Sequence, residues 1–159
     1  MSIEKVKQLM NPLRNITSYK ELSKSFLWTV AKELDASQGA FFTTIEREGI
    51  NYLKFIAGYA YHLPDSESIE FEFGEGLSGQ VAKEGKAINI QAVPDGYITI
   101  LSGLGNATPN AMYIFPIKRD DNVIAVIELA SFKKITKEDE AFIAQLSLQL
   151  DEFLLKCDQ

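Results

Sequence analysis

The middle of the chain has the composition and periodicity of β-strands, with short polar turns between neighbouring strands. Residues 40–45 and 52–59 are rich in aromatic and β-branched side chains, and a charged turn ending in Gly49 separates them. The same arrangement recurs at residues 111–118 and 123–131, on either side of a second charged turn. Strands joined by such short turns pair as antiparallel hairpins. The sequence therefore predicts an antiparallel sheet at the centre of the fold.

Helical periodicity flanks these strands at both ends of the chain. Before Pro12, apolar residues recur at spacings of three and four, and the proline is expected to end or kink this first helix. Ser18 and Glu21 form a capping-box pattern, which predicts a second helix that runs to about Leu34. Thr136 is expected to cap a final helix through its hydroxyl. Strands in the middle and helices at both ends favour an α+β layer arrangement.

Three closely spaced glycines separate a predicted strand from a predicted short helix. Residues 69–73 alternate between apolar and acidic side chains, and the helix is expected at 77–83. Gly74, Gly76 and Gly79 have the spacing found in dinucleotide-binding proteins, but that site needs a parallel βαβ unit. Because the following strands pair as a hairpin, we expect Gly74 and Gly76 to permit positive φ and Gly79 to permit close packing of the helix.

Composition and charge exclude several classes of function. The 159 residues suit one domain with one core, and 16 basic against 22 acidic side chains give a net charge of -6. This balance repels a phosphate backbone, so we expect no nucleic-acid partner. The N-terminal region has no apolar stretch of signal-peptide or membrane-spanning length, so we expect a cytoplasmic protein with no membrane contact.

Only Cys157 and His62 offer thiol or imidazole chemistry. Together they cannot build an intramolecular disulfide, a Cys-Cys redox pair or an ordinary Cys/His zinc site. A single histidine close before Pro64 is more often hydrogen-bonded or solvent-facing than bound to haem iron. We therefore predict no catalytic residue, no metal and no cofactor.

Four segments resemble the motifs of GAF domains, in matching order. They are residues 74–82, 94–105, 113–117 and 126–132, and the resemblance extends over about 19–157. It is greatest to the GAF modules associated with bacterial sensor histidine kinases. The resemblance implies a GAF/PAS-like α+β fold with a central six-stranded antiparallel sheet. It also implies N- and C-terminal helices on one face of the sheet, and short helices and loops over a small-molecule pocket on the other.

On this basis the chain divides into an N-terminal helix at residues 1–14, used for dimerisation or signalling, and a GAF domain at residues 15–159 that includes the long last helix. The loop at residues 94–109 is longer than most connections. It either packs its own apolar side chains onto the sheet or covers a ligand. For a ligand beneath it, alternation along the strands suggests apolar walls and polar contacts from Phe42, Thr44, Tyr97, Ser102, Tyr113 and Glu128.

Glu128 is the most informative of these candidates, because it interrupts an otherwise apolar strand. Burying a carboxylate without a partner is costly. Either Glu128 is bonded internally or exposed at an edge, or it accepts a hydrogen bond from a ligand in the pocket.

The last helix carries a second apolar stripe beside its core-facing stripe. The second stripe consists of Ala141, Ala144, Leu148 and Leu155. It contacts either the N-terminal helix of the same chain or a second copy of the chain, and both hold in a four-helix bundle. Trp28 projects from the polar face of the second helix and is the other candidate for a homodimer interface.

These features favour a non-catalytic sensory or regulatory module that binds a small cytoplasmic ligand and signals through the terminal helices of a homodimer. Its signalling partner would be a histidine kinase or another effector, in cis or in trans. The first alternative is a dimeric scaffold without a ligand. A small enzyme is a distant second, because Cys157 alone cannot supply the two thiols of the GAF-like free methionine sulfoxide reductases.

Overall fold

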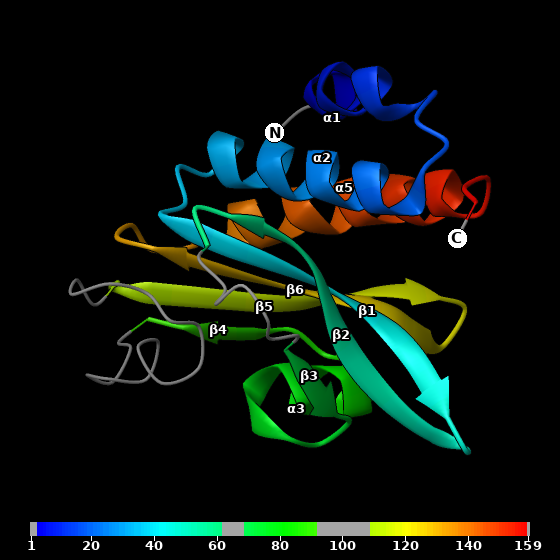
Figure 1. Ribbon diagram of the computed structural model, residues 1–159. Coiled ribbons are helices and arrows are strands. Elements are labelled where there is room, and N and C mark those ends of the chain that lie inside the picture. Colours follow the sequence, from blue (N-terminus) through cyan, green and yellow to red (C-terminus); the bar gives the residue numbers. More distant parts are fainter. Residues whose placement is uncertain (1–2, 62–68, 92–108, 159) are drawn as a thin grey trace.

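The computed structural model describes residues 3–61, 69–91 and 109–158. Within them, one six-stranded sheet has the strand order β3-β2-β1-β6-β5-β4, and every neighbouring pair is antiparallel (Figure 1). The strands are β1 Gln38–Arg47, β2 Ile50–Tyr59, β3 Glu70–Glu72, β4 Ile88–Ile90, β5 Ala111–Arg119 and β6 Asn122–Ser131. Both predicted hairpins and the antiparallel sheet are confirmed.

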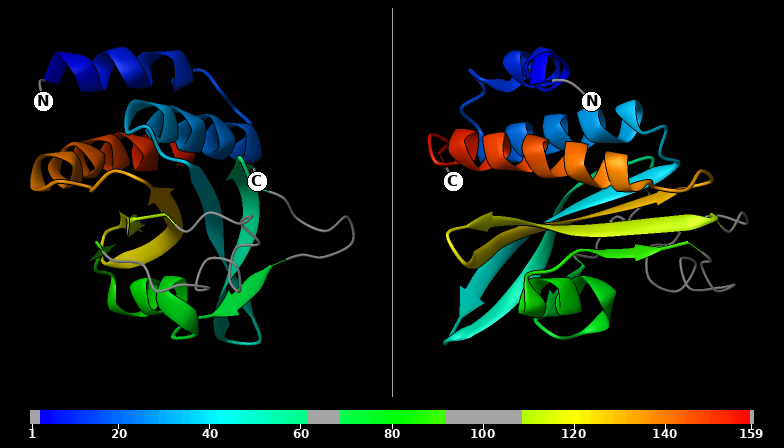
Figure 2. Two further views of the ribbon diagram at one scale, coloured as in Figure 1. Left: turned by 90° about the vertical axis from the view of Figure 1, so that its left-hand side faces the viewer. Right: turned by 180° about the vertical axis from the view of Figure 1, so that it is seen from behind.

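Helices cover the two faces of the sheet unequally. The terminal helices lie together on one face, which we call the helix face, with α1 above the α2 and α5 pair (Figure 2). On the opposite face, which we call the α3 face, lies the short helix α3. The helices are α1 Ile3–Met10, η1 Asn11–Leu13, α2 Tyr19–Glu33, α3 Gly76–Glu84 and α5 Lys137–Leu154.

The central strands β1 and β6 are apolar on both sides, so the sheet needs a cover on each face. On β1, Phe41 packs into the cluster beneath α2 and α5, while Phe42 packs into the cluster beneath α3. On β6, Ile127 and Val126 divide in the same way. Burial of a large apolar side chain contributes about 1.5–3 kcal/mol, so both layers of helix are needed.

Helix ends follow the capping residues closely. Pro12 lies in η1, which ends the regular helix at Met10 as expected. Ser18 accepts a hydrogen bond from the backbone N–H of Glu21, but the reciprocal bond of the predicted capping box is not formed. Thr136 and Asp139 form a complete capping box at the start of α5, in which each side chain accepts a backbone N–H of the other residue.

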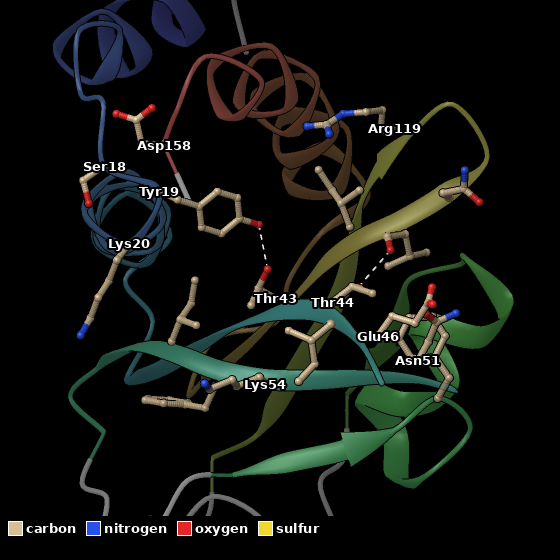
Figure 3. A pocket seen from close by; sticks show the side chains of 17 residues that line it. Ser18, Tyr19, Lys20, Thr43, Thr44, Glu46, Asn51, Lys54, Arg119 and Asp158 are labelled. Carbon is tan, nitrogen blue, oxygen red and sulfur yellow. Dashed lines mark hydrogen bonds between the residues drawn. The ribbon is translucent and has the colours of Figure 1, made fainter. Parts of the chain in front are cut away.

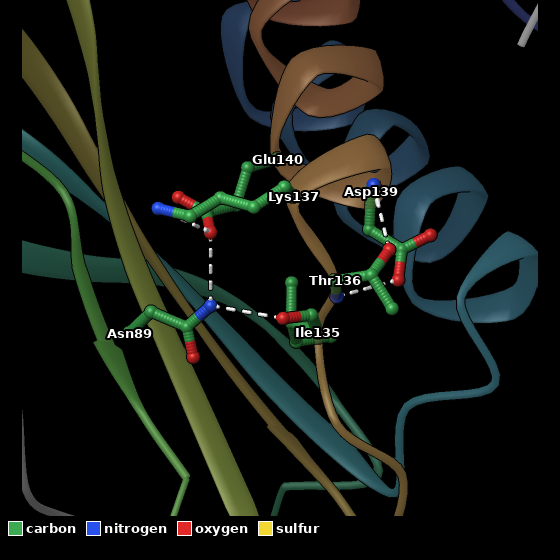
Figure 4. Close-up of polar contacts among 6 residues, drawn as sticks. All are labelled: Asn89, Ile135, Thr136, Lys137, Asp139 and Glu140. Atoms are coloured by element: carbon green, nitrogen blue, oxygen red, sulfur yellow. Dashed lines mark hydrogen bonds and ion pairs between the residues drawn. The ribbon is translucent and has the colours of Figure 1, made fainter.

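The edge strand β4 was not evident from residue patterns, because it has only three residues. It pairs with β5 and is also fastened to the start of α5 by Asn89 (Figure 4). The amide Nδ2 of Asn89 donates to the carbonyl oxygen of Ile135 at 2.9 Å and to Oε2 of Glu140 at 3.1 Å. Asn89 therefore joins the edge of the sheet to the first turn of α5.

The glycine motif serves chain geometry, as predicted. Gly74 and Gly76 have φ of 95° and 66°, values that only glycine adopts readily. Gly79 lies on the inner side of α3, where an added Cβ would come within 2.7 Å of the carbonyl oxygen of Glu72. The backbone of α3 therefore lies directly against the end of β3.

We expect Gly79→Ala to lower the free energy of unfolding by about 1–3 kcal/mol, because α3 would have to shift away from β3. Chemical denaturation measures this loss. Gln80→Ala, at the exposed neighbouring position on α3, serves as the control and should change stability little. Equal stability of both variants would contradict the close approach.

Candidate functional site

A small group of polar side chains lies among apolar residues on the α3 face. Glu128 of β6 stands opposite Ala40 of β1 and Ile114 of β5, and both of these neighbours belong to the α3-side cluster. Ser78 of α3 donates a hydrogen bond to Oε2 of Glu128. Burial raises the pKa of the Glu128 carboxyl above its ordinary value, and the bond from Ser78 opposes this shift in part. The carboxyl is thus internally bonded and held closer to its neutral form.

Gln38 is the second polar residue on this face. It precedes Ala40 by two positions and pairs with Ala130, so its side chain projects from the same side of β1 as Phe42. Only 3% of Gln38 is exposed, and its Oε1 has no hydrogen-bond partner. A buried carbonyl oxygen without a donor costs about 1–3 kcal/mol.

The unpaired oxygen of Gln38 is distinctive because of its location. Among the described residues, the other buried side-chain atoms without a partner belong to Ser23, Asn89 and Gln149. Asn89 bonds to the start of α5, while Ser23 and Gln149 lie on α2 and α5, so all three belong to the helix face. Gln38 alone in this set faces the α3 side.

Aromatic side chains form the wall beside these polar groups. Phe42 meets Phe55 and Phe71 edge to face, at centroid separations of 5.9 and 5.6 Å. Phe55 also contacts Tyr61 at 5.1 Å. Burial, and secondarily the charge of Glu128, raise the pKa of Tyr61 to about 12. Tyr61 is therefore within electrostatic reach of Glu128 and supplies a protonated hydroxyl at neutral pH.

The structure brings together only some of the side chains predicted to bind a ligand. Phe42 and Glu128 share the α3 face as expected. Thr44 instead donates its hydroxyl to the carbonyl oxygen of Val123 at 3.0 Å. Tyr97, Ser102 and the loop at 94–109 up to residue 108 lie outside the described residues.

The placement of Tyr113 in that pocket was wrong. Tyr113 of β5 pairs with Leu129 of β6, stacks on Phe115 and packs into the cluster beneath α5. Burial, and secondarily Glu140 of α5, raise its pKa to about 12. Alternation along β5 places Ile114, one position later, on the α3 face instead.

Residue patterns missed Gln38, Ser78 and Tyr61. The available signal was the position of Gln38, two residues before Ala40 in a predicted strand. Alternation along a strand would place this polar side chain on the same apolar face as Ala40. Ser78 lies on the inner side of α3, one position before Gly79. Its contact with Glu128 joins residues 50 positions apart, and such a separation leaves no local pattern.

A hollow lies where the tip of the β1–β2 hairpin extends beyond the terminal helices (Figure 3). This hairpin groove has a volume of about 1020 Å³. Its central hydroxyls, from Tyr19 and Thr43, are hydrogen-bonded to each other at 2.9 Å. Arg119 is bonded to Asp151 at 3.0 Å. These three polar side chains of the groove thus already have partners within the chain.

The described residues of the chain leave the second apolar stripe of α5 exposed, although α1 packs against α5. Leu148 is 72% exposed and Leu155 is 61% exposed, and both Ala141 and Ala144 are exposed as well. We call these four residues the α5 stripe. Contact with the N-terminal helix, one of the two alternatives drawn from the sequence, does not account for it.

Trp28 is engaged by residues of its own chain. Its indole N–H donates to the carbonyl oxygen of Gly58 at 3.1 Å, and its ring meets Tyr59 edge to face at 5.3 Å. Lys24 and Lys32 both lie over the ring. With 38% of its surface exposed, Trp28 has a local structural role apart from any contact with a second copy.

Further observations concern cofactors and membranes. Across residues 3–61, 69–91 and 109–158, no group of three His, Cys, Asp or Glu side chains is placed to hold a metal ion. Within the same ranges, no helix combines the length and apolar character needed to cross a bilayer. Cys157 packs against the helix-face cluster, and its Sγ donates to the carbonyl oxygen of Ile16 at 3.4 Å. The lone thiol and Glu128 are thus on opposite sides of the sheet.

An antiparallel six-stranded sheet with the terminal helices on one face and a short helix over a polar group on the other is the α+β architecture of GAF-like domains. The chain belongs to the GAF domain family, because the family model described as GAF domain matches residues 17–154. A search of curated proteins by sequence finds no match.

Solved structures share this fold at low sequence identity. The GAF domain of an Acinetobacter phosphoenolpyruvate-protein phosphotransferase is 17% identical, with a TM-score of 0.76 over 98% of this chain and 95% of that one. The A. aeolicus nlh2 GAF domain in an inactive state is 22% identical, with a TM-score of 0.68 over 97% and 92%. A free methionine-R-sulfoxide reductase from Neisseria meningitidis, in complex with its substrate, is 14% identical, with a TM-score of 0.73 over 95% and 86%. Such matches establish the fold.

We expect Glu128→Gln to become more stable relative to the natural protein as pH rises from about 4 to 8. Because burial raises the folded-state pKa above the ordinary 4.5, the folded chain binds more protons than the unfolded chain between those two values. The free energy of unfolding of the natural protein therefore falls as pH rises through this window, and the glutamine variant lacks that loss. Urea denaturation at several pH values measures the difference.

Glu70→Gln provides the contrast. Hydrogen bonding to Arg47 lowers the pKa of Glu70, so the natural carboxylate contributes stability above its unfolded pKa that is lost as pH falls. Because the Arg47–Glu70 pair is exposed, the difference in unfolding free energy between Glu70→Gln and the natural protein should be small. It should change with pH in the direction opposite to that of Glu128→Gln. A pH-independent difference for Glu128→Gln would contradict the shifted pKa.

Proposed function

We propose that the chain is a non-catalytic sensory module that binds a small cytoplasmic molecule on the α3 face and signals as a homodimer. Membership of the GAF family supports a sensory role, which is typical of such domains. The observation that carries the proposal is that one face holds both an unsatisfied buried amide oxygen, on Gln38, and the half-buried carboxyl of Glu128, whose pKa is raised.

A ligand would relieve the unfavourable burial of these groups. Gln38 Oε1 requires a hydrogen-bond donor, and Glu128 has carboxyl oxygen capacity beyond its bond to Ser78. Phe42 and Phe55 supply an apolar surface beside them. The chemistry fits a compact, largely apolar molecule that carries at least one hydrogen-bond donor. Tyr97 and Ser102 of the following loop remain candidate contacts of the same ligand.

Placement of the single thiol supports a role without catalysis. Free methionine-R-sulfoxide reductases are among the proteins that share the fold, and such chemistry requires a thiolate near the substrate. Cys157 is the only cysteine, and burial, followed by the charge of Asp158, raises its pKa. A raised pKa and a location on the helix face both disfavour attack on a molecule bound near Glu128.

The output would pass through the terminal helices, with a histidine kinase or another effector as partner in cis or in trans. The α5 stripe supports dimerisation, because its four exposed apolar side chains follow one line along the helix, where a second copy would cover them together. A dimeric scaffold that binds no ligand is the alternative. It would keep the α5 interface and leave the oxygen of Gln38 unpaired.

We expect one or more members of a broad metabolite and cyclic-nucleotide screen to raise the melting temperature. A ligand at a hundredfold excess over its dissociation constant adds about 2.7 kcal/mol, which corresponds to several degrees for a chain of this size. Gln38→Met removes the unpaired oxygen at nearly constant volume. The variant should be at least as stable without ligand and should lose much of the thermal shift.

Ser23→Ala is the matched control, because it also removes a buried hydrogen-bonding atom without a partner but does so on α2. It should keep the full ligand-induced shift. A screen without any shift, together with mass spectrometry that finds no copurifying small molecule, would favour the scaffold instead.

We expect light scattering to report twice the 17.8 kDa chain mass. Leu148→Glu combined with Leu155→Glu should yield the monomer mass, since charge would then occupy the centre of the contact. Ile50→Glu is the control, because Ile50 is an exposed apolar residue at the tip of the β1–β2 hairpin. A dimer that survives the double substitution would exclude the α5 stripe as the interface.

A further inference from the structure

The α5 stripe has a symmetry that fixes how a second copy can lie against it. Leu148 is seven residues from Ala141 on one side and from Leu155 on the other. Seven residues correspond to about 10.5 Å and nearly two helical turns, so the three side chains lie almost in line. A two-fold axis at Leu148 therefore brings Ala141 of one helix opposite Leu155 of an antiparallel second helix.

We propose that the occupant of the α5 stripe is a second copy of this chain, with the two α5 helices antiparallel and crossing at Leu148. The inference rests on the homodimer of the proposed function and adds its orientation and register.

Side-chain size supports the antiparallel register. The antiparallel register places the small Ala141 of one helix against the large Leu155 of the other at both ends of the contact. Leu148 then meets Leu148 of the second copy in the middle. The separation of the helices is then even along the seam. A parallel arrangement would set alanine against alanine at one end and leucine against leucine at the other, which forces the helices apart at the leucine end.

A hollow beside the stripe provides room for the larger side chain. This hollow of about 240 Å³ lies between α5 and β5 and has Ala144 and Leu148 on its rim. Tyr113 and Phe115 form its apolar floor. In the antiparallel register, Leu155 of the second copy falls between Ala141 and Ala144, at the edge of the hollow.

Charge also distinguishes the two orientations. At about 100° per residue, Glu138, Gln145 and Glu152 follow one flank of the stripe, and Lys156 lies in the turn just beyond the end of α5; all four are exposed. An antiparallel pair brings Glu138 alongside Lys156 of the second copy and Gln145 alongside its Glu152.

Glu140 lies on the other flank of the stripe. In a parallel pair, the flank of one helix that carries Glu138 would lie beside the flank of the second helix that carries Glu140. The acidic first turns of the two helices, and the positive ends of the two helix dipoles, would then lie together. The antiparallel arrangement avoids both like-charge contacts.

Disulfide cross-linking tests the register. In a Cys157→Ser background, which removes the only natural thiol, single cysteines are placed at Leu148→Cys, Ala141→Cys and Leu155→Cys, and a fourth variant combines the last two. Asp121→Cys, at an exposed position in the β5–β6 turn, gives the rate of linkage by random collision. Circular dichroism confirms that each variant is folded.

We expect Leu148→Cys to link far faster than Asp121→Cys under mild oxidation. Ala141→Cys and Leu155→Cys should each link no faster than that control, because two identical positions would stand about 21 Å apart. The combined variant should link rapidly, and peptide mass spectrometry should find position 141 of one chain joined to position 155 of another.

Rapid linkage of all three single variants would overturn the antiparallel register in favour of a parallel pair. A dimeric mass without linkage at position 148 would also overturn the inference, while leaving the homodimer itself intact. A monomeric mass would remove both the inference and the proposed homodimer. Ligand binding on the α3 face is measured separately by the thermal shift and does not depend on these outcomes.

Discussion

The fold depends on the burial of both faces of its two central strands. Adjacent residues Phe41 and Phe42 are each almost fully enclosed, one beneath the terminal helices and the other beneath α3. Since β6 has the same property, neither layer of helix can be removed without exposing large apolar side chains to water. The sheet thereby separates two environments. One is a large, nearly all-apolar core, and the other is a smaller core that includes Glu128 and Gln38.

This separation assigns different roles to the two faces. Polar groups on the helix face include those at helix caps and connections, as with Thr136 and Asn89, and two unpaired oxygens within the helices, on Ser23 and Gln149. Those on the α3 face lie within the apolar layer, where Ser78 bonds to Glu128 and the oxygen of Gln38 has no partner. The carboxyl of Glu128 and the unpaired oxygen of Gln38 on one side of the sheet favour a binding role for the α3 face, while the exposed α5 stripe favours an assembly role for the helix face.

Local patterns predicted the parts of the fold that local interactions determine. Short turns specified both hairpins, Pro12 ended the first helix, and Thr136 began the last. Strand β4 was missed because three residues at an edge carry too little periodicity. The face of Tyr113 was misassigned because alternation along β5 leaves open which side the α3 helix will cover. Gln38 and Ser78 gain significance only from contacts across the sheet, which depend on the tertiary structure.

Asn89 and Arg119 together determine how α5 can move. Asn89 ties the first turn of the helix to β4, and Arg119 of β5 bonds to Asp151 near its other end. With attachments to neighbouring strands at two separated points, the helix can neither roll about its own axis nor swing from one end without breaking a bond. A change in the curvature of the sheet would therefore carry α5 with it as a rigid unit, and the direction in which Leu148 points would report the shape of the sheet.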